Sequence, residues 1–364
     1  MDYTTGSMRK AIFMLAVPMI LEMCMESVFA VVDIFFVGKL GANATATVGL
    51  TESVLTLVYS VAIGISMAAT AMVARRVGEK NQEAASEAGV QSLLLAISIS
   101  IVISIVGLFY ASDILQLMGA TSGIIEEGAT YTRITLTANI VIMLLFLING
   151  IFRGAGNAAI AMRSLWLANI CNIILCPICI HYFGLTGAAM ATTTGRSIGV
   201  CYQLYYLFKG KGVIKITIKH FAPVWDVLKS LTSIASTATL QFLIGSASWV
   251  FLARMIAGFG SEAMAGYTIS IRLIIFFLMP AWGMSNAAAT LVGQNLGAKQ
   301  PERAEASVWK TAKYNAVFMG TVSLLFIIAA PFFVALMNDT PAVVKTGSLA
   351  LRVISCGYLF YGIG

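Results

Sequence analysis

The chain is poor in charged residues, which make up 11% of its 364 residues, whereas hydrophobic residues make up 59%. A soluble protein of ordinary composition carries about 25% charged residues. This scarcity excludes an ordinary soluble fold, because the apolar side chains would leave large uncovered patches. The apolar runs are about 20 residues or longer and do not alternate with polar residues. The sequence therefore predicts membrane-spanning helices rather than the strands of a barrel.

Several motifs of catalysis and energy use are also missing from the chain. It has two histidines, His181 and His220, and it has no nucleotide-binding loop, HExxH motif or GxSxG motif. These absences argue against an ATP-driven pump or a hydrolase, and we expect neither enzyme activity nor a cofactor. The net charge of +7 lies in the connections between apolar runs. It therefore indicates orientation in a lipid bilayer rather than binding to nucleic acid.

The sequence predicts about ten apolar segments joined by short connections. Basic residues gather in alternate connections, from Arg9 before the first segment, through Arg153, to Lys211 and Lys215 in the longest connection. Acidic residues such as Asp339 gather in the other connections. The positive-inside rule then places the N-terminus in the cytoplasm. The expected segments lie near 11–37, 47–74, 88–110, 129–150, 159–181, 184–208, 228–256, 263–293, 311–337 and 343–364.

An internal repeat links the two parts of the chain. Ala62-Ile-Gly-Ile-Ser-Met-Ala-Ala aligns with Ala281-Trp-Gly-Met-Ser-Asn-Ala-Ala without a gap. The spacing from Gly64 to Gly283 defines the repeat offset. Six intervening segments return the chain to the same side of the membrane, so the two copies run parallel. Further matches at the repeat offset are Val73 with Val292, Gly78 with Gly297, Lys80 with Lys299 and Arg133 with Arg352.

The repeat predicts how the chain is divided into domains. Residues 1–208 form a first lobe of about six helices, 209–227 a cytoplasmic linker, and 228–364 a second lobe of about four helices. Counterparts of the fifth and sixth segments would fall near 376–427, beyond the last residue of the sequence. We therefore expect a parent protein of about twelve segments whose second lobe is truncated here. A complete ten-segment protein is the alternative.

Three acidic residues lie within the first apolar segment, and ionisable residues at membrane depth are typical of function. They are Glu22, Glu26 and Asp33. At about 100° per residue they fall on one stripe of a helix, and Pro18 before them is a candidate hinge. A stripe facing an inner cavity would hold protons or a monovalent cation. The alternative is that Glu22 or Glu26 forms an ion pair with a basic residue of another helix.

Other polar residues in the apolar segments are candidates for lining a substrate cavity or for pairing with an acid. Either Arg196 or Arg272 is the expected partner if one of the acidic residues is neutralised. The candidates for the cavity are Arg196, Gln241, Arg272 and Asn286.

Four stretches carry a resemblance to a known family. They are Val31-Val-Asp-Ile-Phe-Phe-Val-Gly-Lys-Leu-Gly41, Asn172-Ile-Ile-Leu-Cys-Pro177, Gly187-Ala-Ala-Met-Ala-Thr192 and Val292-Gly-Gln-Asn-Leu-Gly-Ala298. Together they resemble motifs of the multidrug and toxic compound extrusion (MATE) transporters, and the likeness runs over essentially the whole chain. Gln241 makes the chain most similar to the DinF-type branch of that family.

The resemblance implies two homologous helical lobes around a central cavity that opens alternately to either side, in a monomer of the bacterial inner membrane. It implies a secondary antiporter that exports cationic or amphipathic organic compounds in exchange for H⁺ or Na⁺. The family's first-lobe cation site corresponds here to Asp33, Asn172, Cys176 and Thr192. The family pattern has Asp at the position of Cys176, whose neutral thiol is a poor ligand for a hard cation.

This departure weakens the case for a Na⁺ ion held by Asp33, Asn172 and Thr192. We expect H⁺ as the coupling ion, with Glu26 or Glu22 supplying the second carboxylate. Two other functions stay open on the sequence. One is a flippase or exporter of an amphipathic lipid-linked metabolite. The other is an intramembrane enzyme that uses Glu22 and Glu26.

Overall fold

A computed structural model describes residues 2–209, 212, 214–338 and 340–363, and these contain helices and turns but no strand. Lys211 and Asp339, two residues of the predicted charge pattern, lie outside the described residues. The helices are α1 (Met8–Gly38), α2 (Ala42–Gly78), α3 (Gln82–Leu117), α4 (Ser122–Thr137), α5 (Asn139–Gly154), α6 (Ala158–Phe208), the 3₁₀ turn η1 (Ile218–Phe221), α7 (Trp225–Ala257), α8 (Ser261–Gly297), α9 (Pro301–Ala335), α10 (Pro341–Ser355) and α11 (Tyr358–Ile363).

Seven helical stretches of the described residues are long and apolar enough to cross a membrane. The longest, α6, has 51 residues, whereas one crossing needs about 20. Its backbone leaves the helical region at Gly184 (φ 56°, ψ −137°), where the sequence separates the fifth segment from the sixth. A positive φ favours glycine, because other residues pay a steric penalty there. The all-helical membrane fold is confirmed.

The fourth predicted segment, 129–150, is two helices rather than one. The chain turns at Ala138 (φ −83°, ψ 10°) between α4 and α5, although the two helices form one apolar span from Ser122 to Gly154. The side-chain amide of Asn139 donates to Leu136 O (2.7 Å) and to Ser104 Oγ (2.9 Å). The amide thus caps a carbonyl that the break leaves without its helical partner.

The internal repeat is visible in the backbone as well as in the sequence. Lys80 and Lys299, which the repeat offset pairs, are the non-glycine residues with positive φ in the described chain (57° and 58°). Two helices are kinked at the same offset. The kinks are at Tyr110 of α3 (φ −114°, ψ 17°) and Ala329 of α9 (φ −107°, ψ 19°). The two copies therefore share details of backbone geometry and not only a hydrophobic pattern.

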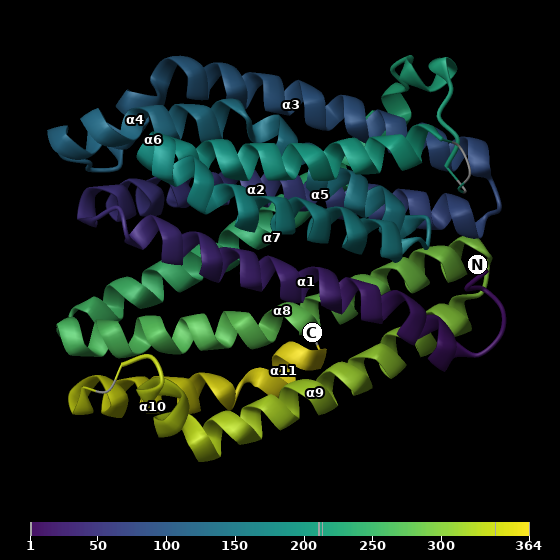
Figure 1. Cartoon of the computed structure of the whole chain (residues 1–364). Helices are drawn as coiled ribbons and strands as arrows, with labels where there is room; N and C mark the ends of the chain where they lie inside the picture. The colour runs from purple at the N-terminus through teal and green to yellow at the C-terminus, as the bar shows by residue number, and fades with distance from the viewer. Residues whose placement is uncertain (1, 210–211, 213, 339, 364) are drawn as a thin grey trace.

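The two copies contact each other through an exchange of helices. Figure 1 shows α2–α6 on one side and α8–α11 on the other, with α1 and α7 running between them. The first helix of each copy packs on the second helix of the other, α1 on α8 and α7 on α2. Gly64 has no room for a side chain against Thr239, and Gly283 has none against Ile20. The repeat offset pairs Ile20 with Thr239, so the contact is reciprocal.

A second reciprocal contact closes the end of the molecule that carries the N-terminus. A Cβ atom at Gly78 of α2 would overlap the backbone of Gln294 in α8, and one at Gly297 of α8 would overlap the backbone of Arg75 in α2. The repeat offset pairs Arg75 with Gln294, as it pairs Gly78 with Gly297. The copies are therefore related by an approximate two-fold axis. At this contact the backbones of α2 and α8 approach each other without side chains between them.

The connection between α6 and α7 lies at this same end, together with the turn between α8 and α9 (Figure 1). Its described part is anchored to α3 by one side chain. Gln91 Nε2 donates to His220 O (2.9 Å) and Ala222 O (2.7 Å), and Val224 N donates to Gln91 Oε1 (3.1 Å). The boundaries at 208 and 227 and the cytoplasmic location of this end stay predictions.

Candidate functional site

The acidic residues of α1 all face helices of the first copy. Glu22 contacts α5, Glu26 contacts α6, and Asp33 lines a cavity with residues of α2, α4 and α6. This is the arrangement that the predicted stripe requires, because residues on one face of a helix meet the same neighbours. The three side chains nevertheless have different surroundings. Two of them are paired with arginines and one is not.

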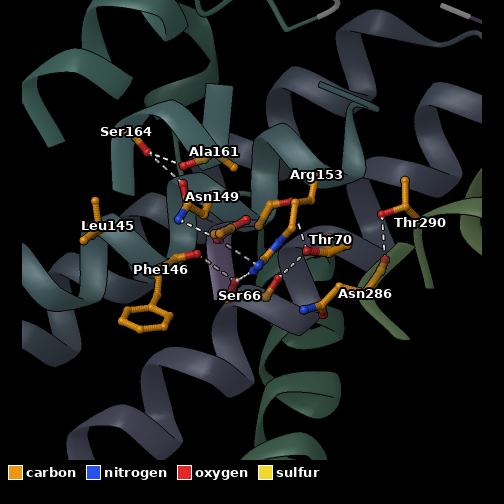
Figure 2. Close-up of polar contacts among 12 residues, drawn as sticks. Ser66, Thr70, Leu145, Phe146, Asn149, Arg153, Ala161, Ser164, Asn286 and Thr290 are labelled. Carbon is orange, nitrogen blue, oxygen red and sulfur yellow. Dashed lines mark hydrogen bonds and ion pairs between the residues drawn. The ribbon is translucent and has the colours of Figure 1, made fainter. Parts of the chain in front are cut away.

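Glu22 is buried and is held by an amide and an arginine of α5. Its Oε1 accepts from Asn149 Nδ2 (2.9 Å) and lies 3.3 Å from Arg153 Nη1. Arg153 Nη2 also donates to Ser66 Oγ of α2 (3.0 Å). Figure 2 shows the Arg153 side chain lying between Asn149 and Ser66. The sequence places Arg153 in a basic connection, but its side chain is 8% exposed, because α5 extends to Gly154.

A chain of hydrogen bonds extends this pair into the first copy. Asn149 Oδ1 accepts from Ser164 Oγ (3.1 Å) and from the amide of Gln203, both on α6. Thr70 Oγ1 of α2 donates to Gly150 O (2.9 Å). Glu22 and Arg153 are thus parts of a network that joins α1, α2, α5 and α6. Such a network strongly favours one arrangement of these helices, since an unpaired buried charge is costly.

Glu26 is paired with Arg196 of α6. The guanidinium Nη2 lies 3.2 Å from Glu26 Oε1, and Asn169 Nδ2 donates to Glu26 Oε2 (3.2 Å). The Arg196 guanidinium also lies over the rings of Phe29 (5.2 Å) and Tyr59 (5.7 Å). The expectation that Arg196 partners an acid is met by this geometry. Both glutamates of the stripe therefore form the ion pairs that the sequence leaves open as the alternative.

Asp33 differs from the two glutamates, because no arginine or lysine of the described chain lies within ion-pair distance of it. The side chain is 9% exposed, and its Oδ1 has no hydrogen-bond partner among the described residues. It lines a cavity of about 40 Å³. That volume holds a few water molecules or an inorganic ion and is too small for a drug-sized molecule.

The other positions of the expected cation site lie on α6. Thr192 lines the same cavity as Asp33, and its Oγ1 accepts from Asn172 Nδ2 (2.9 Å). Asn172 Oδ1 is buried without a partner in the described chain, and Cys176 is fully buried one turn further along the helix. Asp33, Thr192 and Asn172 are thus joined through one cavity and one hydrogen bond, while Cys176 adds only a neutral sulfur.

One carboxylate of the site is missing from the sequence-based prediction. Glu52 of α2 lines the cavity together with Asp33, and it also lines an adjacent depression of about 390 Å³ that is open to the outside. Tyr59, on the same face further along α2, lines both as well. The signal was present, since Glu52 is an acidic residue within the predicted segment 47–74.

The structure does not gather the remaining candidates at this cavity. Gln241 of α7 and Arg272 of α8 have exposed side chains, and Asn286 of α8 is half-buried. The Asn286 carbonyl accepts from Thr290 Oγ1 (3.1 Å) (Figure 2). Pro18 lies inside α1, which remains helical from Met8 to Gly38. A role of these residues in substrate binding or bending stays a prediction.

The charges of the site leave a net negative cavity. Arg153 balances Glu22 and Arg196 balances Glu26, so Asp33 and Glu52 stay without a basic partner in the described chain. An unneutralised carboxylate away from water is costly, and binding a proton or a cation removes that cost. No group of three or more His, Cys, Asp and Glu side chains in the described ranges is placed to share a metal ion. The arrangement therefore suits the reversible binding of a small monovalent cation.

Comparisons with known proteins concern the family and the fold of the chain. A family model described as MatE matches residues 18–178 and 236–364. The chain is 26% identical over 363 residues to the probable multidrug resistance protein NorM of Thermotoga maritima, in an alignment that covers 98% of this chain and 78% of that protein. It is also similar to a solved structure of a MATE transporter in complex with MaL6 (TM-score 0.90, 28% identity, 100% of this chain and 84% of that one). A second similar structure is the outward-facing conformation of a MATE family multidrug resistance transporter (TM-score 0.91, 27% identity, 100% and 84%).

Proposed function

The chain belongs to the MATE family of multidrug efflux transporters, and from this we propose that it is an antiporter for cationic or amphipathic organic compounds. The proposal includes a coupling cation bound in the first copy, with H⁺ in preference to Na⁺. The observation that carries it is the buried carboxylate of Asp33, which has an unpaired oxygen in a small cavity. The proposal places the chain in the bacterial inner membrane as a multi-pass protein, as the family resemblance implies, with the cytoplasmic N-terminus that the predicted charge pattern indicates.

The preference for H⁺ rests on the ligands that surround Asp33. A Na⁺ ion needs several oxygen ligands, and the expected cation site supplies them from Asp33, Thr192 and the free Oδ1 of Asn172. Cys176 contributes no oxygen at the position where the family pattern has a carboxylate, and the guanidinium of Arg196 lines the same cavity. A proton needs one carboxylate oxygen and no coordination shell, so this set of residues favours it.

Exchange follows if the proton and the organic compound favour different conformations. Protonation neutralises Asp33 and removes the cost of an isolated charge, so it stabilises the conformation in which the cavity is small. Loss of the proton restores the charge, which attracts water and favours a more open arrangement of α1, α2 and α6, and the organic cation binds to that open arrangement. The proton gradient then sets the direction of export, and bending at Pro18 is the proposed response of α1.

Growth of a transporter-deficient bacterial host on ethidium tests this function. Cells that express the chain should tolerate several-fold more ethidium than cells with an empty vector, and Asp33→Asn should remove the protection at equal protein level. Equal sensitivity of cells with the chain and cells with the empty vector would refute export of this class of compound. Full protection by Asp33→Asn would leave export standing and refute the role of Asp33.

A further inference from the structure

We propose that Glu52 forms with Asp33 a two-carboxylate proton site, in which Glu52 exchanges protons between the small cavity and the open depression on α2. This inference rests on the proposed function and adds the second carboxylate of the coupling site. Glu22 and Glu26, the candidates from the sequence, each have an arginine within ion-pair distance. Glu52 has none in the described chain, and it is the acid that shares a cavity with Asp33.

Glu52 lies where the small cavity meets the open depression. Glu52 and Tyr59 are the residues common to the linings of the 40 Å³ cavity and the 390 Å³ depression. Glu52 itself is exposed, whereas Asp33 is buried with a free oxygen. A proton that enters the open depression therefore meets Glu52 first, and it reaches Asp33 through the small cavity. The titratable groups that line the cavity with Glu52 are Asp33 of α1, Tyr59 of α2, Tyr131 of α4 and Arg196 of α6.

The small cavity has the size and polarity needed to connect the two acids. Its volume of about 40 Å³ exceeds the roughly 10–15 Å³ that one water molecule requires. Thr192, Thr135 and Tyr131 add hydroxyl groups to its lining. A water molecule there has the two to four polar partners that ordered water needs. Chains of acidic residues and water are a common proton path within membranes.

The second copy shows that the fold does not require these polar residues. At the repeat offset, Asp33 corresponds to Leu252 and Glu52 to Ile271. Tyr59 corresponds to Leu278, which belongs to the apolar core of the second copy, and Ile271 packs against that core. If Asp33 and Glu52 served only to pack the helices, the second copy, which has the same backbone, would be expected to keep at least one of them. Their joint presence in the first copy points to a shared chemical task.

The experiment uses the full chain in proteoliposomes, with ethidium as the probe and a pH gradient of fixed size imposed over a series of absolute pH values. We expect Glu52→Gln to lower gradient-driven ethidium transport by at least about tenfold and to flatten its pH profile. Glu52→Asp keeps the carboxylate and should retain part of the transport together with the pH dependence. Ethidium binding to the protein in detergent, measured at one fixed pH, should change by less than about twofold in both variants, because the small cavity has no room for the drug.

Glu126→Gln is the matched control, because Glu126 is exposed on α4 and lies outside the lining of either cavity. It should leave the rate and the pH profile unchanged. Transport by Glu52→Gln with the wild-type pH profile would overturn the inference. Loss of ethidium binding in Glu52→Gln, with an unchanged pH profile, would assign Glu52 to the drug instead and would also overturn it.

A second arm replaces the pH gradient by a Na⁺ gradient at equal pH on both sides. The inference predicts no ethidium transport by the wild-type protein under this gradient, and Na⁺-driven transport that depends on Glu52 would overturn the proton assignment. If the wild-type protein moves no ethidium under either gradient, the proposed function fails. If the wild-type protein moves ethidium under the pH gradient and Glu52→Gln behaves like the wild type, this inference alone fails.

Discussion

Glu22 and Arg153 show how far a single buried residue can be understood from the sequence. The sequence identifies Glu22, because a carboxylate in an apolar segment is conspicuous. It does not identify Arg153 as its partner, because a basic residue near a predicted helix end is typical of the membrane surface. The decisive fact is that α5 extends to Gly154 and carries Arg153 into the interior. Glu52 is equally conspicuous as an acid in an apolar segment, but only the fold shows that it lies at the same cavity as Asp33.

The ion pair predicts an asymmetric response to mutation. Glu22→Gln leaves the Arg153 guanidinium buried and uncompensated, which should cost about 3–5 kcal/mol. The double variant Glu22→Gln/Arg153→Met removes both charges and should recover most of that loss. Thermal unfolding of the purified protein in detergent measures the four members of this cycle. Independent, additive effects of the two substitutions would contradict a direct interaction between the side chains.

At the scale of helices, the sequence predicts spans better than it predicts breaks. The separation of the fifth and sixth segments at Gly184 is recovered, because the glycine interrupts an otherwise apolar run. The break at Ala138 is not, since the apolar pattern continues through it and only the Asn139 amide marks the turn. Hydropathy reports how apolar a segment is. It does not detect a side-chain amide that takes the place of a backbone N–H as the donor to a helical carbonyl.

The anchoring of the connection between α6 and α7 gives a prediction at this scale. Gln91→Leu leaves His220 O, Ala222 O and Val224 N without their partner, at about 1–3 kcal/mol for each group that stays buried. The connection should then detach from α3, and trypsin should cleave faster at Lys215 and Lys219.

Gln82→Leu is the matched control for this experiment, because Gln82 begins the same helix and its side chain is exposed. Time courses of limited trypsin digestion, read by mass spectrometry, compare the two variants with the wild type. Equal cleavage rates in all three proteins would show that Gln91 does not anchor the connection.

On the scale of the whole molecule, the repeat offset is the most productive feature of the sequence. The two lysines with positive φ and the two kinks of α3 and α9 are each related by this offset, because equivalent sequences adopt equivalent backbones. It does not predict where the two copies touch. That depends on packing across the approximate two-fold axis, which a one-dimensional alignment cannot contain.

The contact across this axis predicts the effect of one added methyl group. Gly78→Ala would press a Cβ atom against the Gln294 backbone, and crowding of this kind costs about 1–3 kcal/mol. We expect the variant to disfavour the closed contact between α2 and α8 and to lower ethidium transport. Gly245→Ala in α7, where a Cβ atom meets open space, is the control and should be nearly neutral. Equal transport rates in both variants would contradict the proposed close approach.

Coupled flux tests the central claim of this account, that Asp33 links cation binding to export. Purified protein in proteoliposomes would be given an ethidium gradient, and ethidium movement and the pH of the lumen would be recorded together. The account predicts that wild-type protein moves protons against ethidium and that Asp33→Asn moves none, while both proteins bind ethidium. Proton movement coupled to ethidium by Asp33→Asn at the wild-type rate would contradict it.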